Sequence, residues 1–293
     1  MQTKGIVLAG GTGSRLFPAT LGLSKQLLHV YDKPMIYYPL ATLMSAGIKD
    51  FCIIVNKIEV EMFKKLLGDG SQWGIKIEFQ IQESPEGIPQ AFIIAEAFLD
   101  GDNAALILGD NLFIGHGLGR SLSEVITPNG AHIFLYEVEH PENYGVPIFD
   151  NNKRILMLTE KPEKPEHNLA IPGLYFFDNS VSDRARNLNK SKRGEYEIVD
   201  LLQSYAIEHR LTYTELSRGT AWLDTGSPED LFNAGEFVRV IQQRQGSFIA
   251  CLEEIAYRNG WISLDVLTEQ QKRMEKSPYG NYLQRIITKS AGK

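Results

Sequence analysis

Cysteine is scarce in this sequence: only Cys52 and Cys251 occur among 293 residues. They lie far apart along the chain, and Cys52 falls inside the apolar run 51–55. Two such residues offer neither the cysteine density of a disulfide scaffold nor the close spacing of a zinc site. We therefore expect two reduced thiols in the core.

Long apolar runs are lacking too, since no segment approaches the roughly 20 residues that a membrane-spanning helix needs. The chain passes from Met1, Gln2 and Thr3 directly into an apolar run, which leaves no room for the pattern of a secretory signal peptide. These features predict a cytoplasmic protein without a membrane partner.

The sequence has no excess of positive charge, because 30 lysines and arginines face 36 aspartates and glutamates, for a net charge of −6. This balance disfavours a nucleic-acid partner that depends on a broad basic surface. A phosphorylated small molecule needs only a local basic pocket and stays compatible with the composition. Internal repeats and low-complexity linkers are absent as well, so independent domains are not expected.

A glycine-rich segment follows the first apolar run. Gly10, Gly11 and Gly13 come directly after residues 5–9, and Arg15 and Lys25 follow them. Glycines at the carboxyl end of a buried strand let backbone N–H groups approach a polyphosphate. The segment matches neither a Walker loop nor a Rossmann fingerprint, whose third glycine would have to replace Leu16. A tight strand-to-helix turn explains the glycines alone, whereas the two cations favour a phosphate site.

Strand-like and helix-like segments alternate along the chain, which predicts a doubly wound α/β sheet with a helical C-terminal tail. We expect a single domain over 1–240, with a nucleotide-binding half at about 1–110 and a sugar- or substrate-binding half at about 111–227. Residues 241–293 would form a helical extension for packing or oligomerisation. The predicted strands are 5–9, 51–56, 75–82, 104–108, 133–137, 173–177, 211–216 and 221–226, with a hairpin of 146–149 and 155–159. The predicted helices are 34–46, 59–67, 90–99, 197–209, 228–245, 254–259 and 265–276.

Asp110 and Asp224 each follow a short apolar run, more than a hundred residues apart. Two carboxylates at strand ends beside a basic loop suit a Mg²⁺ ion held by few protein ligands and by substrate phosphates. A role as turn former or helix cap is the plain alternative for each aspartate.

Three further groups are candidates with plain alternatives. Glu160 and Lys161 precede a proline that ends a strand, which is also typical of a solvated turn. Tyr144 and Gly145 precede another strand and are compatible with simple packing. Gln82 ends an alternating strand, and its amide offers both a donor and an acceptor to a nucleobase, although a surface position is the ordinary one.

Taken together, these pieces resemble the sugar-1-phosphate nucleotidylyltransferases over nearly the entire chain and in order. The combination is far more specific than any one piece. The matching segments are LAGGTGSRLFPAT from Leu8, SKQLL from Ser24, YDKPMIYYPL from Tyr31, LLGDGSQWG from Leu66, QAFIIAEAF from Gln90, LGDNLF from Leu108, EKP from Glu160, GLYFFD from Gly173 and AWLDTG from Ala221.

The resemblance implies a Rossmann-like mixed sheet of the nucleotide-diphospho-sugar transferase type and a role for each matching position. The triphosphate site would contain Leu8, Gly10, Gly11, Thr12, Gly13 and Arg15. Lys25, with Gln26 beside it, would stabilise departing pyrophosphate, and Gln82 and Gly87 would read the thymine or uracil edge. Asp110 and Asp224 would hold magnesium. Tyr144, Gly145, Glu160 and Ile171 would contact the sugar, and Lys161 would hold its phosphate.

The sequence departs from the family pattern at a few positions. His29 replaces a proline, Pro147 and Ile148 replace Val-Glu, Thr159 replaces a glutamate, and Pro89 replaces a small residue. Pro147 in particular is expected to affect strand pairing near the sugar, because proline cannot donate to a ladder. None of these changes removes a residue expected to do the chemistry, so they bear on sugar preference.

The implied activity is transfer of a thymidylyl group from dTTP to glucose 1-phosphate, the first step toward dTDP-deoxysugars such as dTDP-rhamnose. The same chemistry with UTP stays open, as does a non-catalytic nucleotide-sugar sensor. A sensor has no need of all five charged residues, however: Arg15, Lys25, Asp110, Lys161 and Asp224. The resemblance also implies a homotetramer with a second, regulatory nucleotide site built from Gly115, His116, Arg218, Glu254 and Ile255. The helical tail by itself supports only packing on its own domain.

Overall fold

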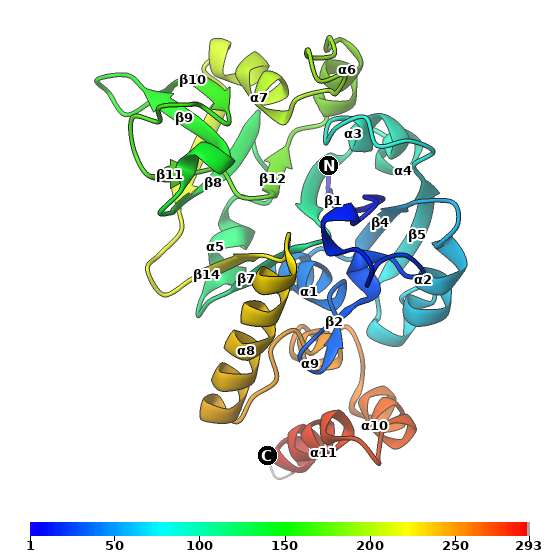
Figure 1. Cartoon of the computed structure of the whole chain (residues 1–293). Coiled ribbons are helices and arrows are strands. Elements are labelled where there is room, and N and C mark those ends of the chain that lie inside the picture. The colour runs from blue at the N-terminus through cyan, green and yellow to red at the C-terminus, as the bar shows by residue number, and fades with distance from the viewer. Residues whose placement is uncertain (292–293) are drawn as a thin grey trace.

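The core of the protein is an eight-stranded mixed sheet in the computed structural model, which describes residues 1–291 (Figure 1). Its strands run in the order β11-β8-β12-β6-β1-β4-β5, with β13 paired to β8. Strands β6, β1, β4 and β5 are parallel, whereas β12 is antiparallel to both β6 and β8. The bounds are β1 Thr3–Ala9, β4 Asp50–Val55, β5 Lys76–Ile81, β6 Asn103–Leu108, β8 Ala131–Glu137, β11 Leu169–Ala170, β12 Leu174–Phe177 and β13 Leu211–Glu215.

Helices cover both faces of this sheet because its central strands are apolar on both sides. In β1, Val7 faces one hydrophobic cluster and Ile6 the other. The first cluster includes α1 Tyr37–Ser45, α2 Val60–Leu67, α5 Leu118–Glu124, α9 Leu252–Arg258, α10 Leu264–Arg273 and α11 Pro278–Ala291. The second includes α3 Gln90–Ile94, α4 Glu96–Leu99, α6 Val181–Arg186 and α7 Ile198–Ile207. The predicted doubly wound sheet is thereby confirmed.

Three short strand pairs stand beside the main sheet. They are β2 His29–Val30 with β3 Lys33–Pro34, β7 Asn111–Ile114 with β14 Ala221–Asp224, and β9 Gly145–Phe149 with β10 Ile155–Glu160. The last is the predicted hairpin, and Pro147 sits within it opposite Leu158. The expected disturbance by Pro147 therefore does not prevent pairing. The ladder shifts register between Ile155 and Met157 instead.

Two helix predictions were wrong in their bounds, and four short strands and two helices were missed. The helix expected from residue 34 begins at Tyr37, because Pro34 is extended and pairs with His29 in the β2–β3 hairpin. Met35 and Ile36 follow it and donate their N–H groups to the Leu28 and Gln26 carbonyls. The helix expected over 90–99 is broken at Ala95 into α3 and α4. The elements that were not predicted are β2, β3, β7, β11, α5 and α6.

The C-terminal tail packs on its own chain. Helix α8, Pro228–Gln245, starts at a capping box of Ser227 and Asp230. Beyond it, the carboxylate of Glu253 accepts hydrogen bonds from Trp73 Nε1 at 2.9 Å and from the Tyr279 hydroxyl. Figure 1 shows α9, α10 and α11 gathered at one end of the molecule, opposite α6 and α7.

A buried lysine joins this tail to the β2–β3 hairpin. Lys33 is only 4% exposed, and its ammonium lies over the rings of Tyr38, Phe248 and Tyr279 at 5.2 to 6.0 Å. It also pairs with Asp32 at 2.5 Å. Burial lowers the pKa of Lys33, whereas Asp32 opposes that shift. The aromatic faces supply the cation with part of the stabilisation that water would give.

Cys52 and Cys251 are both free and buried, as predicted. Among residues 1–291, none of the helices has the length and apolarity to cross a bilayer.

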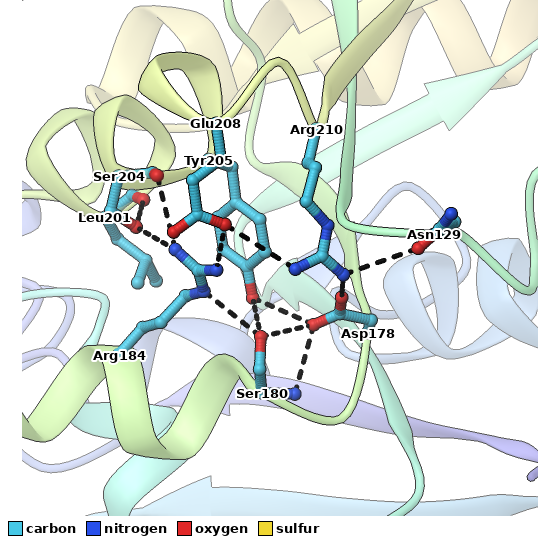
Figure 2. A network of polar contacts seen from close by, with 9 residues as sticks. All are labelled: Asn129, Asp178, Ser180, Arg184, Leu201, Ser204, Tyr205, Glu208 and Arg210. Carbon is cyan, nitrogen blue, oxygen red and sulfur yellow. Dashed lines mark hydrogen bonds and ion pairs between the residues drawn. The ribbon is translucent and has the colours of Figure 1, made fainter.

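A buried carboxylate closes the junction of β12, α6, α7 and β13 (Figure 2). Asp178, 6% exposed, pairs with Arg210 at 2.5 Å. It also accepts hydrogen bonds from the backbone and hydroxyl of Ser180 and from the Tyr205 hydroxyl at 3.2 Å. Arg184 lies over the Tyr205 ring, 4.1 Å from its centroid. The network fixes the C-terminal part of α7.

We predict that Asp178→Ala lowers the free energy of unfolding by about 2–4 kcal/mol, because it leaves the Arg210 cation and the Tyr205 hydroxyl without their acceptor. Urea denaturation measures the change. Asp183→Ala is the matched control on α6, since its carboxylate is 76% exposed and pairs with Arg186 at the surface. It should cost less than about 1 kcal/mol. Equal losses in both variants would contradict the role given to Asp178.

Candidate active site

The glycine segment lies at the carboxyl end of β1 and lines a cavity of about 220 Å³. Gly13 has φ +62°, a conformation that side-chain-bearing residues rarely adopt, and a Cβ there would lie 3.2 Å from side-chain atoms of Lys25 and Thr20. The Thr20 hydroxyl donates to the Gly13 carbonyl at 2.8 Å and fixes the turn. The cavity is lined by Gly11, Thr12, Gly13, Ser14, Arg15, Leu16, Lys25, Gln26, Asp110 and Gly226.

The strongest charge contact in this cavity joins Lys25 to Asp110. Lys25 Nζ lies 2.6 Å from Asp110 Oδ2, and the lysine side chain is 7% exposed. Asp110 follows β6, the neighbour of β1 in the sheet, so parallel pairing brings the two strand ends together. The Gly109 N–H, just before Asp110, bonds to the Leu8 carbonyl at 2.9 Å.

Asp224 lies next to this ion pair, although it is more than a hundred residues further along the chain than Asp110. Strand β14 pairs antiparallel with β7, and Asp224 stands opposite Asn111, next to Asp110. The Thr225 hydroxyl donates to the Asp110 carbonyl at 2.9 Å. Burial, and then the charge of Asp110, raises the pKa of Asp224 to about 6. The structure thus brings the two predicted aspartates together and leaves their negative charge incompletely compensated.

These two carboxylates suit a divalent cation that takes its other ligands from a bound phosphate. Within residues 1–291, no group of three or more histidines, cysteines and carboxylates is arranged to hold a metal ion. The oxygen donors are those that a hard cation such as Mg²⁺ prefers, and their mutual repulsion favours a cation between them. The residues therefore fit the ion but do not form a complete cage for it.

Arg15 lies against the turn after Asp224. A Cβ at Gly226 would stand 3.0 Å from Arg15 Nη1 and 3.2 Å from Nη2. A side chain at Gly226 would thus press on the guanidinium, which explains the glycine in that turn. The arginine side of the cavity is exposed, whereas Lys25 and Gln26 are buried.

Gln82 lies beside the glycine segment, 4% exposed, with its Oε1 only 2.2 Å from where a Cβ of Gly10 would be. Gln90 fixes the orientation of its amide. Gln90 Oε1 accepts from the Glu86 N–H at 3.1 Å and from Gln82 Nε2 at 2.6 Å. Because the Glu86 N–H requires an acceptor, Gln82 must present its amide nitrogen to Gln90. Its carbonyl oxygen and its second amide hydrogen are then left for a ligand.

A second cavity of about 130 Å³ adjoins the aspartates on the other side. It contains the predicted residues Tyr144, Gly145, Glu160 and Ile171, and Gly145 and Ile171 form a β-bridge. Burial raises the pKa of Glu160, while Lys161 and Arg193 oppose that shift. The further lining residues are Ile88, Leu108, Asn111, Asn143, Gly173, Tyr175, Ile198, Val199, Trp222 and Asp224.

Lys161 lines neither cavity. It follows β10 with φ +48°, an uncommon conformation for a residue with a side chain, and its N–H bonds to the Tyr144 carbonyl at 2.9 Å. Such backbone strain is typical of functional sites. The exposed side chain stands beside Glu160 at the edge of the second cavity.

Four residues of this site were missed by reasoning from the sequence. Gln90 orients Gln82, as described above. Asn111 Oδ1 accepts from Trp222 Nε1 at 2.7 Å and from the Gly173 N–H at 3.1 Å, and Trp222 packs on the Tyr144 ring at 5.0 Å. Arg193 lies 3.7 Å from the Glu160 carboxylate. All but Arg193 stand in the matching segments, so those segments were the available signal.

The five residues expected to form a regulatory site are only partly brought together. Gly115, His116 and Ile255 line one cavity of about 420 Å³ between α1, β7, α8 and α9. Glu254 lines a different cavity of about 550 Å³, together with Arg258, Arg285 and Lys289. Arg218 lines neither, although the next residue, Gly219, lines the first.

Known proteins resemble this chain over almost its full length. A model of the family described as nucleotidyl transferase matches residues 4–240. The glucose-1-phosphate thymidylyltransferase of Neisseria meningitidis serogroup A is 50% identical over 287 residues, which cover 98% of this chain and 100% of the relative. The enzyme of the same name from Mycobacterium tuberculosis is 48% identical, with the same coverage of both chains.

Solved structures have the same fold. A Bacillus anthracis protein assigned as a glucose-1-phosphate thymidylyltransferase, in complex with a sucrose, superposes with a TM-score of 0.74 at 36% identity, over 81% of this chain and 95% of that one. A UDP-glucose pyrophosphorylase complexed with UDP-glucose gives a TM-score of 0.71 at 24% identity, over 82% and 100% of the two chains. The second similarity bears on the fold alone.

Proposed function

The chain belongs to the nucleotidyl transferase family, and we propose that it transfers a thymidylyl group from dTTP to α-D-glucose 1-phosphate, giving dTDP-glucose and pyrophosphate. The observation that carries this proposal is the meeting of Lys25, Asp110 and Asp224 between two cavities. One cavity offers a glycine turn and cations to a triphosphate, and the other offers carboxylate, amide and aromatic groups to a sugar. The names of the relatives specify which triphosphate and which sugar phosphate.

The reaction is an in-line displacement at the α-phosphorus of the nucleotide. A phosphate oxygen of glucose 1-phosphate forms the new bond to this phosphorus, the bond to the β-phosphate bridging oxygen breaks, and pyrophosphate leaves with that oxygen. The attacking oxygen is already an anion, so no protein base is needed. The main tasks of the protein are to hold two anions that repel each other and to neutralise the developing charge.

Each charged residue has a place in this scheme. Lys25 and Arg15 steady the β- and γ-phosphates as they depart, with the N–H groups of the glycine segment. Lys161 and Arg193 hold the attacking phosphate at the edge of the sugar cavity. Asp110 and Asp224 would hold Mg²⁺ together with phosphate oxygens of the nucleotide. That ion, when bound, offsets the negative charge that accumulates on those phosphates.

Base recognition rests on Gln82. Its carbonyl oxygen and remaining amide hydrogen match the N3–H and a neighbouring carbonyl of thymine. Uracil presents the same groups, so uridylyl transfer is the runner-up. A sensor without catalysis is a weaker alternative, because a binding module gains nothing from a second carboxylate, Asp224, beside Asp110.

A nucleotide panel tests this function most directly. We predict Mg²⁺-dependent pyrophosphate release with glucose 1-phosphate that is fastest with dTTP, slower with UTP and lowest with CTP and ATP. Turnover of UTP above that of dTTP would reverse the base assignment. Tight binding of dTDP-glucose without any pyrophosphate release would favour the sensor.

The charge assignments predict that Lys161→Ala lowers kcat/KM for glucose 1-phosphate by about 10²–10³-fold, because the attacking phosphate loses a positioning cation. Steady-state pyrophosphate release measures the loss. Lys164→Ala is the matched control, since this exposed lysine follows in the same loop, and it should stay within about twofold of wild type. Near-normal pyrophosphate release by Lys161→Ala, or by Asp110→Ala, would contradict the roles given to these charged residues.

We also propose that the protein acts in the cytoplasm, where nucleoside triphosphates and sugar phosphates are made, and that it assembles as a homotetramer. Exposed apolar side chains on α8, Phe232 at 65% and Val240 at 42%, support self-association. The cavity that contains Gly115, His116 and Ile255 is the proposed regulatory site; Arg218 and Glu254 lie outside it, each next in sequence to one of its lining residues, Gly219 and Ile255.

Solution mass measurement checks the assembly. We predict the mass of four chains and inhibition of pyrophosphate release by dTDP-rhamnose at a site where dTTP does not compete. A monomer mass at micromolar concentration would contradict the tetramer, and purely competitive inhibition would contradict the second site.

A further inference from the structure

The turn of residues 84–87, which follows Gln82 and is called the nucleobase turn below, is in direct contact with a loop from the later part of the chain. This loop, residues 188–197, is called the bridging loop below. The Tyr196 N–H donates to the Glu86 carbonyl at 2.8 Å, and Lys190 Nζ lies 3.0 Å from Glu86 Oε1. Lys190 also lies over the Tyr196 ring, 5.2 Å from its centroid. These contacts join two segments about a hundred residues apart.

Gly87 shows how closely the two segments approach. Its φ is +103°, and a Cβ at this position would stand 2.1 Å from the Tyr196 carbonyl oxygen. No side chain fits between the turn and the bridging loop. A displacement of the turn therefore displaces Tyr196 as well.

The same loop holds Arg193. The Arg193 guanidinium bonds to the Glu197 carboxylate at 3.1 and 2.6 Å and stands 3.7 Å from Glu160. The Ser191 N–H bonds to the Glu195 carbonyl at 2.8 Å, and the Ser191 hydroxyl bonds to Glu197 at 2.6 Å. These internal bonds make residues 191–197 a compact unit, so that movement at Tyr196 is passed to Arg193.

The helices on both sides of the bridging loop are held in place. Arg186, at the end of α6, pairs with Glu96 on α4, and the buried Ser182 hydroxyl of the same helix donates to the Phe92 carbonyl of α3 at 3.0 Å. Helix α7 begins directly after Glu197, and its C-terminal part is fixed by the Asp178 network (Figure 2). Because both anchors are fixed, a shift of the turn reaches Arg193 instead of being absorbed by movement of α7.

We propose that Lys190 and Tyr196 are positioning residues that couple the nucleobase turn to Arg193, so that bound nucleotide increases the affinity for the sugar phosphate. This inference rests on the proposed function, in which the base lies at Gln82 and Gly87 and the phosphate at Lys161 and Arg193. A base that settles on the turn restrains Glu86 and Gly87, and their contacts with Lys190 and Tyr196 restrain the arginine. Thermodynamic linkage makes the effect reciprocal, so the sugar phosphate also tightens nucleotide binding.

Such coupling serves the chemistry. Two polyanions in adjacent cavities repel each other, and this repulsion alone would make the second substrate bind more weakly than the first. Restraint of Arg193 by the nucleotide offsets that repulsion at the step where both must be held. A loop that only packs against the turn would leave the repulsion in place.

Calorimetry measures the coupling as the Kd of glucose 1-phosphate without the nucleotide analogue divided by its Kd with saturating analogue. The probes are glucose 1-phosphate and dTTP with a methylene group in place of the α,β-bridging oxygen, which binds but does not react. In the wild-type protein with Mg²⁺, we expect saturating analogue to lower the Kd of glucose 1-phosphate by about 5- to 50-fold, the range of common allosteric couplings. Lys190→Ala removes the ion pair with Glu86, and Lys190→Ala/Tyr196→Ala also removes the ring beneath the ammonium while the backbone contacts of residue 196 stay, so the ratio should fall to about half of the wild-type value or less. The Kd of each probe alone should change by less than about twofold.

Two further variants separate coupling from loss of charge or of folding. Lys192→Ala removes one exposed positive charge from the same loop and should keep the wild-type ratio. Lys190→Arg keeps a cation over Tyr196 and should restore most of the ratio. A wild-type ratio of one or below, or an unchanged ratio in the double variant, would overturn the inference while leaving the proposed function intact. Wild-type protein that neither binds the analogue nor releases pyrophosphate would instead overturn the proposed function, and the inference with it.

Discussion

The ion pair of Lys25 and Asp110, with Asp224 beside it, is the interaction on which the rest of the structure depends. Lys25, Asp110 and Asp224 lie far apart in the sequence, and a different strand pairing or turn places each side chain. Parallel pairing of β1 with β6 brings Asp110 to the glycine segment, and the β7–β14 ladder brings Asp224 to Asp110. The cavity lined by the glycine segment lies on one side of this junction and the cavity lined by Tyr144 and Glu160 on the other, so under the proposed function the junction is where the two substrates meet.

The fold supports this junction from a distance. The segment that carries Lys25 is held at its start by Asp110 and at its end by Lys33, whose ammonium is enclosed by aromatic rings from α1 and from the C-terminal tail. The tail therefore does more than cover the sheet, since it anchors the hairpin that follows Lys25. Hydrogen bonds also fix side chains elsewhere in the candidate site: Gln90 orients Gln82, and Asn111 accepts from the indole N–H of Trp222. A site that must hold two anions that repel each other benefits from such preorganisation, because a group already in place does not have to reorient during the reaction.

The sequence was sufficient for the sheet, the glycine turn and both aspartates, because these depend on local signals: apolar runs, glycines and carboxylates at strand ends. The sequence was insufficient to predict those elements and residue positions that depend on contacts between distant segments. Helix α1 begins only at Tyr37 because Pro34 pairs with His29 in the β2–β3 hairpin, and β7 is recognisable only by its pairing with β14. Arg193 has no motif of its own, and its place near Glu160 follows from how the bridging loop closes on Glu197 and Glu86. The regulatory residues show the same limit, since Arg218 and Glu254 fall outside the cavity that contains the other three.

The central claim is that Asp110 and Asp224 are kept close at a cost to stability because the chemistry needs both charges. The most direct test is the free energy of unfolding of Asp224→Asn at pH 8 in EDTA, measured by urea denaturation against wild type. The raised pKa of Asp224 predicts that the variant is more stable by about 1–3 kcal/mol, since the buried charge is removed and the shape is kept. The same variant should lose the stabilisation that Mg²⁺ and dTTP give the wild-type protein. A variant that is less stable than wild type in EDTA, or that keeps the full effect of Mg²⁺ and dTTP, would contradict the account.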